Sequence, residues 1–463
     1  MSINFKATDR PAALYSYSFS PNPSWSTLKP SGQEILAYLM SVCKKYKIMD
    51  NIQTNTEVIS LQWDPEPEEW IAQAIVYPPS HSSGAKVGRS GGQSLRIRAK
   101  AVISAVGRFT IPKVSEIERL PGVKDFEGPI IHTAQWDKTV NLKGKNVIVV
   151  GTGCSAAQLV PKLVSPMIQA KSVIQLVRTP PWVAPALLSD RVLYLWETYM
   201  PWIMQHIPGV MWVVRFLVFA VTELSFFLFF RINQSAPIRR EQKRSQLLDY
   251  MKREVPQRYH EIMTPQYDVG CKRLIHDSGW YSCLNNPSVQ IMQMSLKQFQ
   301  RRSVTLQTRA GKANSHACHD VEVPADAIIL ATGYDMEQQL LPTLRVFGRN
   351  GVELHSLWEQ RGGAQAYLGL AVDGFPNLYF LLGPNSSSGY TSVLLGIENN
   401  LRYIISLLRP LLHGEIRTCE IRSEACQKWT QKVQSTSQKS VWMQGGCRNW
   451  YIADGKWNPI IYP

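Results

Sequence analysis

A glycine turn between an apolar strand and an apolar helix is the first chemically informative feature of the chain. Residues 146–150 predict a strand, residues 157–163 repeat apolar side chains at helical spacing, and the turn between them reads Gly151-Thr152-Gly153-Cys154-Ser155-Ala156. The first glycine allows a tight turn, the second lets the backbone approach a pyrophosphate, and the alanine allows close helix packing. Because a helix amino end favours an anion, this segment predicts a dinucleotide site, to which Gln158 on the same helix also belongs.

An arginine at the end of the next predicted strand indicates which dinucleotide is bound. Residues 172–177 are expected to form that strand, and Arg178 and Thr179 follow it. An acidic residue at this place binds a ribose hydroxyl and repels a 2′-phosphate, whereas a guanidinium offers phosphate a fork of donors. We therefore expect NADPH to be preferred over NADH. The alternative is a surface arginine without a ligand.

A second string, of the form FxGxxxHxxxW, lies just before the strand that leads to the glycine turn. It runs from Phe126 to Trp136 and includes His132. Together with the turn, it resembles the flavin-dependent Baeyer–Villiger monooxygenases, and within them the fungal enzymes of polyketide and related secondary metabolism. The resemblance covers nearly the whole chain and continues through segments 14–25, 63–64, 175–182, 270–273, 331–335, 382–385 and 449–451.

The resemblance implies a role for each residue that matches a motif of the family. Arg273 matches the arginine beside the flavin that stabilises the negative charge of the oxygenated flavin, and a fixed cation does this efficiently in a dry site. Asp9 matches the acid that pairs with this arginine and holds its orientation. These two are the predicted catalytic residues. The neighbouring Lys272 matches a second contact to the 2′-phosphate.

Other matches are cofactor contacts or belong to the signature string. Three fall where the family contacts flavin and one falls near the nicotinamide; these are Tyr15, Val58, Val393 and Trp450, in that order. His132 and Trp136 match residues at the domain connection that couple domain movement to turnover. We expect His132 to be a structural histidine through which no proton is transferred.

The implied reaction uses FAD, NADPH and molecular oxygen. One oxygen atom is inserted next to a ketone carbonyl, which gives an ester or a lactone. The expected substrate is a large apolar or aromatic ketone of fungal secondary metabolism, and an anthraquinone-type ketone of the aflatoxin and sterigmatocystin type is the specific hypothesis. Two alternatives stay open: a truncated, non-catalytic remnant that binds NADPH, and a flavin enzyme that hydroxylates nitrogen or sulfur.

The segment before Asp9 lacks the glycine fingerprint with which members of the family bind the flavin pyrophosphate. They carry a first βαβ unit there, whose helix amino end is the anion site. We therefore expect either a shortened FAD domain that lacks this unit or a misassigned start. Whether FAD binds without the unit is left open.

The elements that must position these residues indicate an α/β fold with two Rossmann-like nucleotide-binding domains. Apolar periodicity predicts one helix and three strands after it, over residues 32–48, 56–63, 70–77 and 95–103. Two apolar runs that end in small residues, 101–107 and 327–333, are expected as strands at the two points where the chain crosses between domains. The first of these runs is expected to be buried.

These crossings suggest that one domain is inserted in the other. The expected NADPH domain is residues 138–325, with a helical insertion at 183–260. The truncated, discontinuous FAD domain is expected on either side of it, over residues 1–137 and 326–463.

Composition and charge favour a basic enzyme over a nucleic-acid-binding protein. The chain has 463 residues, 44% of them hydrophobic, and a net charge of +15. Because its Lys and Arg are scattered without long runs, phosphate-bearing cofactors explain the charge and no nucleic acid is expected. The eight cysteines are dispersed without zinc spacing, which favours a reducing, cytoplasmic compartment. Segment 316–320 is expected to be an exposed hairpin tip, with no metal.

Residues 207–230 are strongly apolar. A membrane-spanning helix needs ~20 nearly uncharged residues, whereas Arg215 and Glu223 interrupt this stretch and Pro208 lies near its start. Two interpretations stay open. The stretch is either a buried or lid helix, or a helix that lies in a membrane interface.

Overall fold

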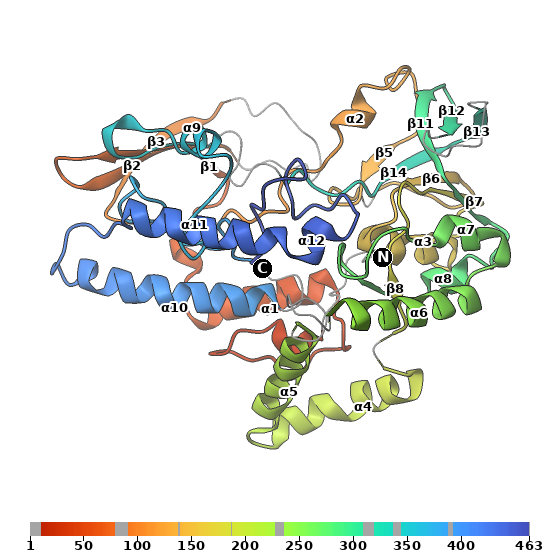
Figure 1. Cartoon of the computed structure of the whole chain (residues 1–463), viewed down its shortest axis with the longest axis horizontal. Helices are drawn as coiled ribbons and strands as arrows, with labels where there is room; N and C mark the ends of the chain where they lie inside the picture. The colour runs from red at the N-terminus through yellow and green to blue at the C-terminus, as the bar shows by residue number, and fades with distance from the viewer. Residues whose placement is uncertain are drawn as a thin grey trace. The chain divides into compact units, whose positions relative to one another are not determined.

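The computed structural model describes residues 11–78, 91–137, 139–186, 188–226, 236–308, 319–336, 344–387 and 392–462. Within these residues the chain forms two compact units. Unit 1 contains residues 111–194 and 237–335, and unit 2 contains residues 11–110, 195–236 and 336–462. The units differ from the domains expected from the sequence in two ways. Residues 111–137 and 326–335, expected in the FAD domain, lie in unit 1. Residues 195–236 of the helical insertion, expected in the NADPH domain, lie in unit 2. Figure 1 gives the order of the elements along the chain.

Unit 1 is built on a five-stranded sheet in the order β10-β7-β6-β14-β5, with all neighbours parallel. Its strands are β5 (Ile130–His132), β6 (Asn146–Val150), β7 (Ser172–Leu176), β10 (Val289–Met292) and β14 (Ala327–Leu330). The two faces of β6 belong to different cores: Val147 and Val149 pack with helix residues, whereas Ile148 packs with a second sheet. A sheet covered on both faces explains why its strands are continuous apolar runs in the sequence.

Helices cover one face of this sheet and a small antiparallel sheet covers the other. The helices are α3 (Cys154–Val164), α6 (Ala236–Glu254), α7 (His260–Met263) and α8 (Trp280–Cys283). The second sheet contains β11 (Met294–Phe299), β12 (Ser303–Thr308) and β13 (Asp320–Pro324). Because β12 and β13 pair as neighbours, the expected hairpin is present, although its tip lies outside the described residues. The remaining elements of unit 1 are α2 (Ser115–Glu118), β8 (Val183–Ala184), β9 (Ile275–His276) and the short η4 (Gln257–Tyr259).

The two chain segments at the edge of unit 1 pair with each other. Lys113 N–H donates to the carbonyl of Gly333 at 2.9 Å, and Asp335 N–H donates to the carbonyl of Ile111 at 2.8 Å. The chain enters unit 1 after Thr110 and leaves it after Asp335. Both changes of unit therefore follow the small-residue ends of the two runs that the sequence singles out.

Unit 2 contains a four-stranded sheet and a two-stranded one. The larger sheet has the order β15-β1-β2-β3, with β1 (Thr56–Asp64), β2 (Glu69–Val76), β3 (Gln93–Ala99) and β15 (Arg345–Phe347). Neighbours are antiparallel except β1 and β15. The smaller sheet pairs β4 (Val102–Ser104) with β16 (Leu378–Phe380) in parallel. The prediction of one strand over 95–103 was wrong, because the chain leaves one sheet after Ala99 and enters the other at Val102.

The expectation of a buried strand at 101–107 was also wrong. Strand β4 has only three residues, and Ile103 is 38% exposed. Although the run is apolar, β4 is hydrogen-bonded along a single edge, by β16, and its side chains are not fully buried. Gly107 still ends the run with a positive φ of 75°, a conformation that suits glycine.

The helices of unit 2 lie before, between and after its strands in the sequence. They are η1 (Ala12–Leu14), α1 (Gly32–Lys45), η2 (Met49–Asn51), α5 (Val210–Ser225), η5 (Arg349–Gly351), α9 (Leu354–Gln360), α10 (Val393–Leu412), α11 (Ser423–Gln438) and α12 (Val441–Gln444). Helix α4 (Asp190–His206) begins in unit 1 and ends in unit 2. The sequence signals explain the bounds of α1: Ser31 caps its first turn through Glu34 N–H, and Lys44 and Lys45 lie in its last turn.

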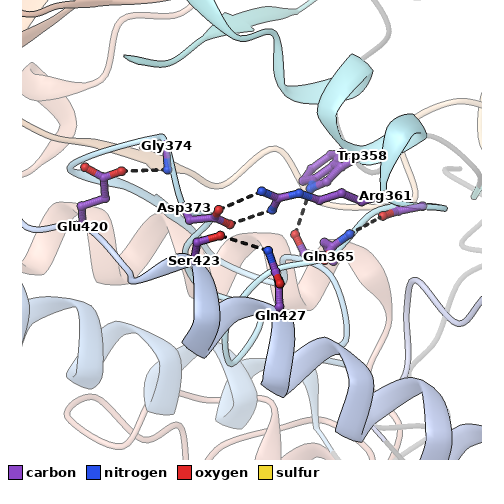
Figure 2. A network of polar contacts seen from close by, with 9 residues as sticks. Trp358, Arg361, Gln365, Asp373, Gly374, Glu420, Ser423 and Gln427 are labelled. Carbon is purple, nitrogen blue, oxygen red and sulfur yellow. Dashed lines mark hydrogen bonds and ion pairs between the residues drawn. The ribbon is translucent and has the colours of Figure 1, made fainter. Parts of the chain in front are cut away.

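A polar network holds the loops that follow α9 in unit 2 (Figure 2). Arg361 donates to both carboxylate oxygens of Asp373, at 2.7 and 2.8 Å. Trp358 Nε1 donates to the carbonyl of Gln365 at 2.9 Å, and Gly374 N–H donates to Glu420 at 2.8 Å. A charged pair with bidentate geometry is among the stronger polar contacts in a protein, so this network fixes the loop between α9 and β16.

The apolar stretch 207–230 forms α5 only in part, and residues 227–230 lie outside the described ones. Of the interpretations left open, a fully buried helix does not fit α5, because Phe216 is 65% exposed and Trp212 is 54% exposed. The lid and the interfacial interpretations stay open. The opposite face is buried and includes Met211, Val214 and Arg215. Among the described residues, none of the helices combines the length and the apolar character that crossing a bilayer requires.

Candidate functional site

The glycine turn of unit 1 connects the buried strand β6 to helix α3. Gly151 has a φ of 116°, and a Cβ there would lie 2.5 Å from the carbonyl oxygen of Ala331. By contrast, a Cβ at Gly153 would meet nothing within 4 Å. The first glycine is therefore required by the protein itself, and the second leaves open space. No side chain caps the amino end of α3, as expected where a helix end binds a phosphate.

A buried glutamine holds this turn in place. Gln175, which is 0% exposed, donates from Nε2 to the carbonyl of Gly151 at 2.9 Å and accepts from Trp280 Nε1 at 2.9 Å. The Thr152 hydroxyl donates to the carbonyl of Thr179 at 3.1 Å. The turn is thus joined to the end of β7, where Arg178 lies. Gln175 was missed in the sequence, although a polar residue in an otherwise apolar strand is a usable signal.

Two aromatic residues bring Lys272 to the same place as Arg178. Trp182 Nε1 donates to the carbonyl of Tyr267 at 2.9 Å, and the Tyr267 hydroxyl donates to the carbonyl of Pro180 at 3.0 Å. The Lys272 ammonium lies 4.9 Å from the centre of the Tyr267 ring. Burial, and after it the positive charge of Arg178, lower the pKa of Lys272 to about 8. Two cations crowded in this way favour the binding of an anion between them.

Of the two predicted catalytic residues, Arg273 and Asp9, the structure describes only Arg273. Arg273 is half-buried and follows Lys272 directly, shortly before β9, which pairs in parallel with β8. Asp9 lies outside the described residues. Arg273 therefore lies directly after Lys272 in the chain, and its pairing with Asp9 stays a prediction.

In unit 2, two of the expected flavin contacts lie on neighbouring segments. The Ser392 hydroxyl donates to the carbonyl of Leu14 at 2.7 Å. Tyr15 follows Leu14, and Val393 follows Ser392 as the first residue of α10. Tyr15 is half-buried and Val393 is 41% exposed, so both side chains remain accessible to a ligand. Ser392 was missed in the sequence because its partner lies at the other end of the chain.

The position expected near the nicotinamide, Trp450, and the third expected flavin contact, Val58, have different surroundings. The Trp450 ring lies 5.6 Å from the ring of Phe109, in an edge-to-face arrangement. Phe109 lies in the segment that follows β4, so Trp450 packs against that segment. Val58 is in β1 and packs partly against the core of the four-stranded sheet.

Arg108 is a buried cation that sequence reasoning missed. Its guanidinium donates to the carbonyl oxygens of Leu382, Gly383 and Ile460. Burial lowers its pKa to about 9. These carbonyls belong to the 382–385 motif and to the end of the chain, so Arg108 fixes the motif beside β4. A charged residue directly after the run 101–107 was the available signal.

The histidine of the signature string has the surroundings of a structural residue. His132 ends β5, is buried, and accepts a hydrogen bond at Nδ1 from Ala134 N–H at 3.1 Å. Its ring meets Tyr334 edge to face, with centres 6.0 Å apart. Trp136 packs partly against the core of unit 1. In the part of the chain that is described, no group of three or more His, Cys, Asp or Glu side chains could hold a metal ion.

Comparison with known proteins identifies the class. Residues 28–204 match the family described as flavin-binding monooxygenase-like. A Baeyer–Villiger monooxygenase of Streptomyces coelicolor is 31% identical over 468 residues, which cover 99% of this chain and 79% of the relative. The FAD-binding monooxygenase ktnD of Aspergillus niger is 28% identical over 455 residues, which cover 97% of this chain and 69% of the relative.

Solved structures show the same fold. Cyclohexanone monooxygenase from Rhodococcus sp. Phi1, bound to NADP+, matches with a TM-score of 0.75 at 22% identity, covering 99% of this chain and 86% of that one. A steroid monooxygenase bound to NADP matches with a TM-score of 0.74 at 23% identity, with the same coverage. The expected α/β fold with two Rossmann-like nucleotide-binding domains is thereby confirmed.

The chain belongs to the flavin-binding monooxygenase-like family, and its relatives include enzymes named Baeyer–Villiger monooxygenases. It is therefore an oxidoreductase of the monooxygenase class. The residues around the turn fit a dinucleotide, because the space at Gly153 and the paired cations Lys272 and Arg178 suit a pyrophosphate and a second phosphate.

Proposed function

We propose that the protein is an FAD- and NADPH-dependent monooxygenase that inserts one oxygen atom next to a ketone carbonyl. The observation that carries the proposal is the segment of unit 1 in which Lys272, beside Arg178, is followed directly by Arg273. One short segment would thus offer a cation to the 2′-phosphate of NADPH and the next cation to the flavin. Relatives with the name Baeyer–Villiger monooxygenase support insertion at a ketone over hydroxylation of nitrogen or sulfur.

The predicted site residues named below then have defined tasks. When bound, FAD accepts hydride from NADPH and activates molecular oxygen for transfer to the ketone. Arg178 and Lys272 bind the 2′-phosphate, and α3 with its uncapped amino end binds the pyrophosphate. Arg273 stabilises negative charge at the reacting oxygen, and Asp9 holds that arginine in orientation. Tyr15, Val393 and Trp450 position the rings and exclude water.

A large apolar or aromatic ketone is the proposed substrate class. The support for it is the composition of the insertion, residues 183–260, which is rich in Trp, Phe, Leu and Met. In α5 and the end of α4, several aromatic side chains are exposed, including Tyr199, Trp202, Trp212 and Phe216. Apolar and aromatic side chains dominate pockets for such ligands. Two Aspergillus relatives named FAD-binding monooxygenases, ktnD and tazF, favour a fungal enzyme of secondary metabolism. An anthraquinone-type ketone stays the specific hypothesis.

The same exposed face supports peripheral contact with a lipid bilayer. Tryptophan and tyrosine favour the boundary between headgroups and acyl chains, and the exposed patch of α5 is larger than scattered surface residues explain. A few residues after α5 in the sequence, segment 231–244 carries five Lys or Arg against one Glu, which would attract anionic headgroups. The proposed occupant of this face is therefore an anionic membrane surface.

Flavin content and product analysis test the main proposal. Purified protein should have bound flavin by absorbance, and turnover of cyclic and polyketide ketones with NADPH should give products heavier by one oxygen atom. Labelled oxygen gas should supply that atom. A colourless protein that still binds NADPH would instead support the non-catalytic alternative, and products hydroxylated on nitrogen or sulfur would support the other one.

Sedimentation with lipid vesicles tests the membrane proposal. The protein should sediment with vesicles that contain phosphatidylserine, and Trp212→Ser with Phe216→Ser should weaken this about tenfold. Leu412→Ser is the matched control, because Leu412 is an exposed apolar residue on a different helix, 75% accessible. Equal binding by the double variant and the wild type would contradict the proposal.

A further inference from the structure

The segment that carries Tyr15 is held by an arginine from the helical insertion. Arg215 lies on the inner face of α5 and is only 7% exposed. Its Nη1 donates to the carbonyl of Ala13 at 2.6 Å, to the carbonyl of Ser16 at 2.8 Å and to the Ser16 hydroxyl at 3.0 Å. Both backbone acceptors flank Tyr15, which Arg215 therefore holds from either side.

Helix α10 holds the same segment at other points. Ser392 donates to the carbonyl of Leu14 at 2.7 Å. Glu398, which is also buried, accepts from the backbone N–H of Ser18 at 2.8 Å and from its hydroxyl at 2.7 Å. Residues 13–18 thus have four backbone groups bound by side chains from two helices that lie far away in the sequence.

Because Arg215 is charged and buried, losing its hydrogen bonds to the carbonyls of Ala13 and Ser16 would be costly. Burial lowers the pKa of Arg215, and the negative charge of Glu398 partly opposes the shift. A buried guanidinium must have its N–H groups bound, and peptide carbonyls serve this purpose here. An apolar side chain would fill the same space more cheaply, because the rest of α5 is almost entirely apolar. The hydrogen bonds to the two carbonyls therefore explain why an arginine occupies this position of an apolar helix.

The two faces of α5 differ in what they contact. The inner face carries Arg215 and the buried Met211 and Val214, whereas the outer face exposes Trp212 and Phe216. One helix turn thus separates an exposed apolar surface from the backbone on both sides of Tyr15. Because the hydrogen bonds of Arg215 join α5 to this backbone, a change in the position of α5 would be passed to the residues on both sides of Tyr15.

We propose that Arg215 is a positioning residue through which the insertion helix α5 sets the location of Tyr15, and through it the ring that Tyr15 contacts when the cofactor is bound. The inference rests on the proposed function for its catalytic consequence, because that proposal places Tyr15 at the flavin. Its structural consequence, an ordered segment 13–18 that depends on α5, is independent of any cofactor. Arg215 is not a catalytic residue and acts only through the backbone that it binds.

Three variants separate this role from a general effect on folding. Arg215→Met keeps the length and apolar stem of the side chain but removes every donor. Arg215→Lys retains a charged donor that can reach one or both carbonyls. Arg191→Met is the matched control, because Arg191 is an exposed arginine on α4 of the same insertion.

Hydrogen–deuterium exchange of the protein without ketone is the first measurement. We expect exchange of the peptide covering residues 11–20 to rise about tenfold in Arg215→Met, with most of the protection restored in Arg215→Lys. Peptides from β6 and α3 should be unchanged, as should all peptides in Arg191→Met. Unchanged exchange over 11–20, or an equal rise throughout the chain, would overturn the proposal.

Steady-state kinetics give the second measurement. The KM for the ketone should rise about tenfold in Arg215→Met, and more NADPH should be oxidised per product formed, while the KM for NADPH stays constant. If the wild type oxidises no ketone, the proposed function fails but the exchange experiment still decides the role of Arg215. A wild-type KM in Arg215→Met with a local rise in exchange would show that the location of Tyr15 has no effect on ketone turnover and so overturn the inference.

Discussion

The side-chain hydroxyl of Ser392 donates a hydrogen bond to the carbonyl oxygen of Leu14, which lies 2.7 Å away and 378 residues earlier in the chain. Both partners are buried. The bond places Tyr15 and the first residue of α10, Val393, on adjacent segments. Two positions that the family resemblance assigns to flavin are thereby brought together by a contact that neither segment reveals alone.

Removing the Ser392 hydroxyl should weaken this junction. Ser392→Ala leaves the Leu14 carbonyl without its partner in a buried place, and such a loss costs about 1 to 3 kcal/mol of unfolding free energy. Flavin retention after gel filtration should fall as well. Ser406→Ala is a suitable control, because this serine bonds within an exposed turn of the same helix, to Tyr403. Equal loss of flavin from both variants would refute a special role for Ser392.

Phosphate recognition by Arg178 and Lys272 should determine the choice of dinucleotide. Replacing either residue by Ala removes a charge-assisted hydrogen bond worth about 1.5 to 3 kcal/mol, so the KM for NADPH should rise about 10- to 100-fold. The KM for NADH should change little, because NADH lacks the 2′-phosphate. Lys171→Ala, at the residue directly before β7, serves as the control for a lost surface charge. Parallel changes for both nucleotides would exclude phosphate contact.

The lowered pKa of Lys272 predicts a pH dependence of NADP+ binding. Its pKa is about 8 in the free protein, and the phosphate binds the protonated ammonium. Affinity should therefore be retained below pH 8 and fall about tenfold between pH 7 and pH 9, as the protonated fraction falls. Titration calorimetry of NADP+ against NAD+ measures this, and NAD+ should show a flat profile. A steep profile that persists in Lys272→Arg would assign the titration to another group.

The Arg361–Asp373 pair of Figure 2 should contribute to acid stability. Burial raises the pKa of Asp373, but hydrogen bonds from Arg361 and Ser423, together with the charge of Arg361, overcome this effect and keep the pKa below its ordinary value. The pair's contribution is thus fully present above the ordinary Asp pKa and is lost as the pH falls through the lower, folded-state value.

The variant Asp373→Asn should lower the free energy of unfolding by about 2 kcal/mol at pH 7, because Arg361 remains partly buried without its partner. Urea denaturation at pH 7 and pH 3 would measure the effect, and the difference between variant and wild type should shrink at the lower pH. Asp64→Asn breaks the more exposed contact with Arg98 and should cost at most about 1 kcal/mol. Identical losses in both variants would contradict the special status of Asp373.

Arg273 should be required for oxygen transfer and dispensable for hydride transfer. Arg273→Ala removes the cation that stabilises negative charge at the reacting oxygen, so product formation should fall at least about 100-fold. NADPH should still reduce bound flavin in an anaerobic stopped-flow experiment. Arg273→Lys keeps the charge and should retain part of the activity. Normal product formation by the alanine variant would remove Arg273 from the mechanism.

Local sequence determined the elements that depend on neighbours in the chain. The glycine turn with its strand and helix, the amino-terminal cap of α1 and the hairpin of β12 and β13 were all predictable, because turn chemistry, capping and periodicity act over a few residues. The signature string and the glycine turn also indicated the family, which the relatives confirm.

Tertiary structure decided the features whose partners are remote. It made β4 a short, half-exposed strand, placed the middle of the insertion in unit 2, and exposed an apolar face on α5, a helix for which the sequence left burial, a lid and a membrane interface open. It also recruited Gln175, Arg108, Arg215 and Ser392, whose partners lie in other elements. The physical reason is that apolar periodicity records how a residue prefers to be solvated, whereas a buried polar side chain is placed by the single backbone group that satisfies it.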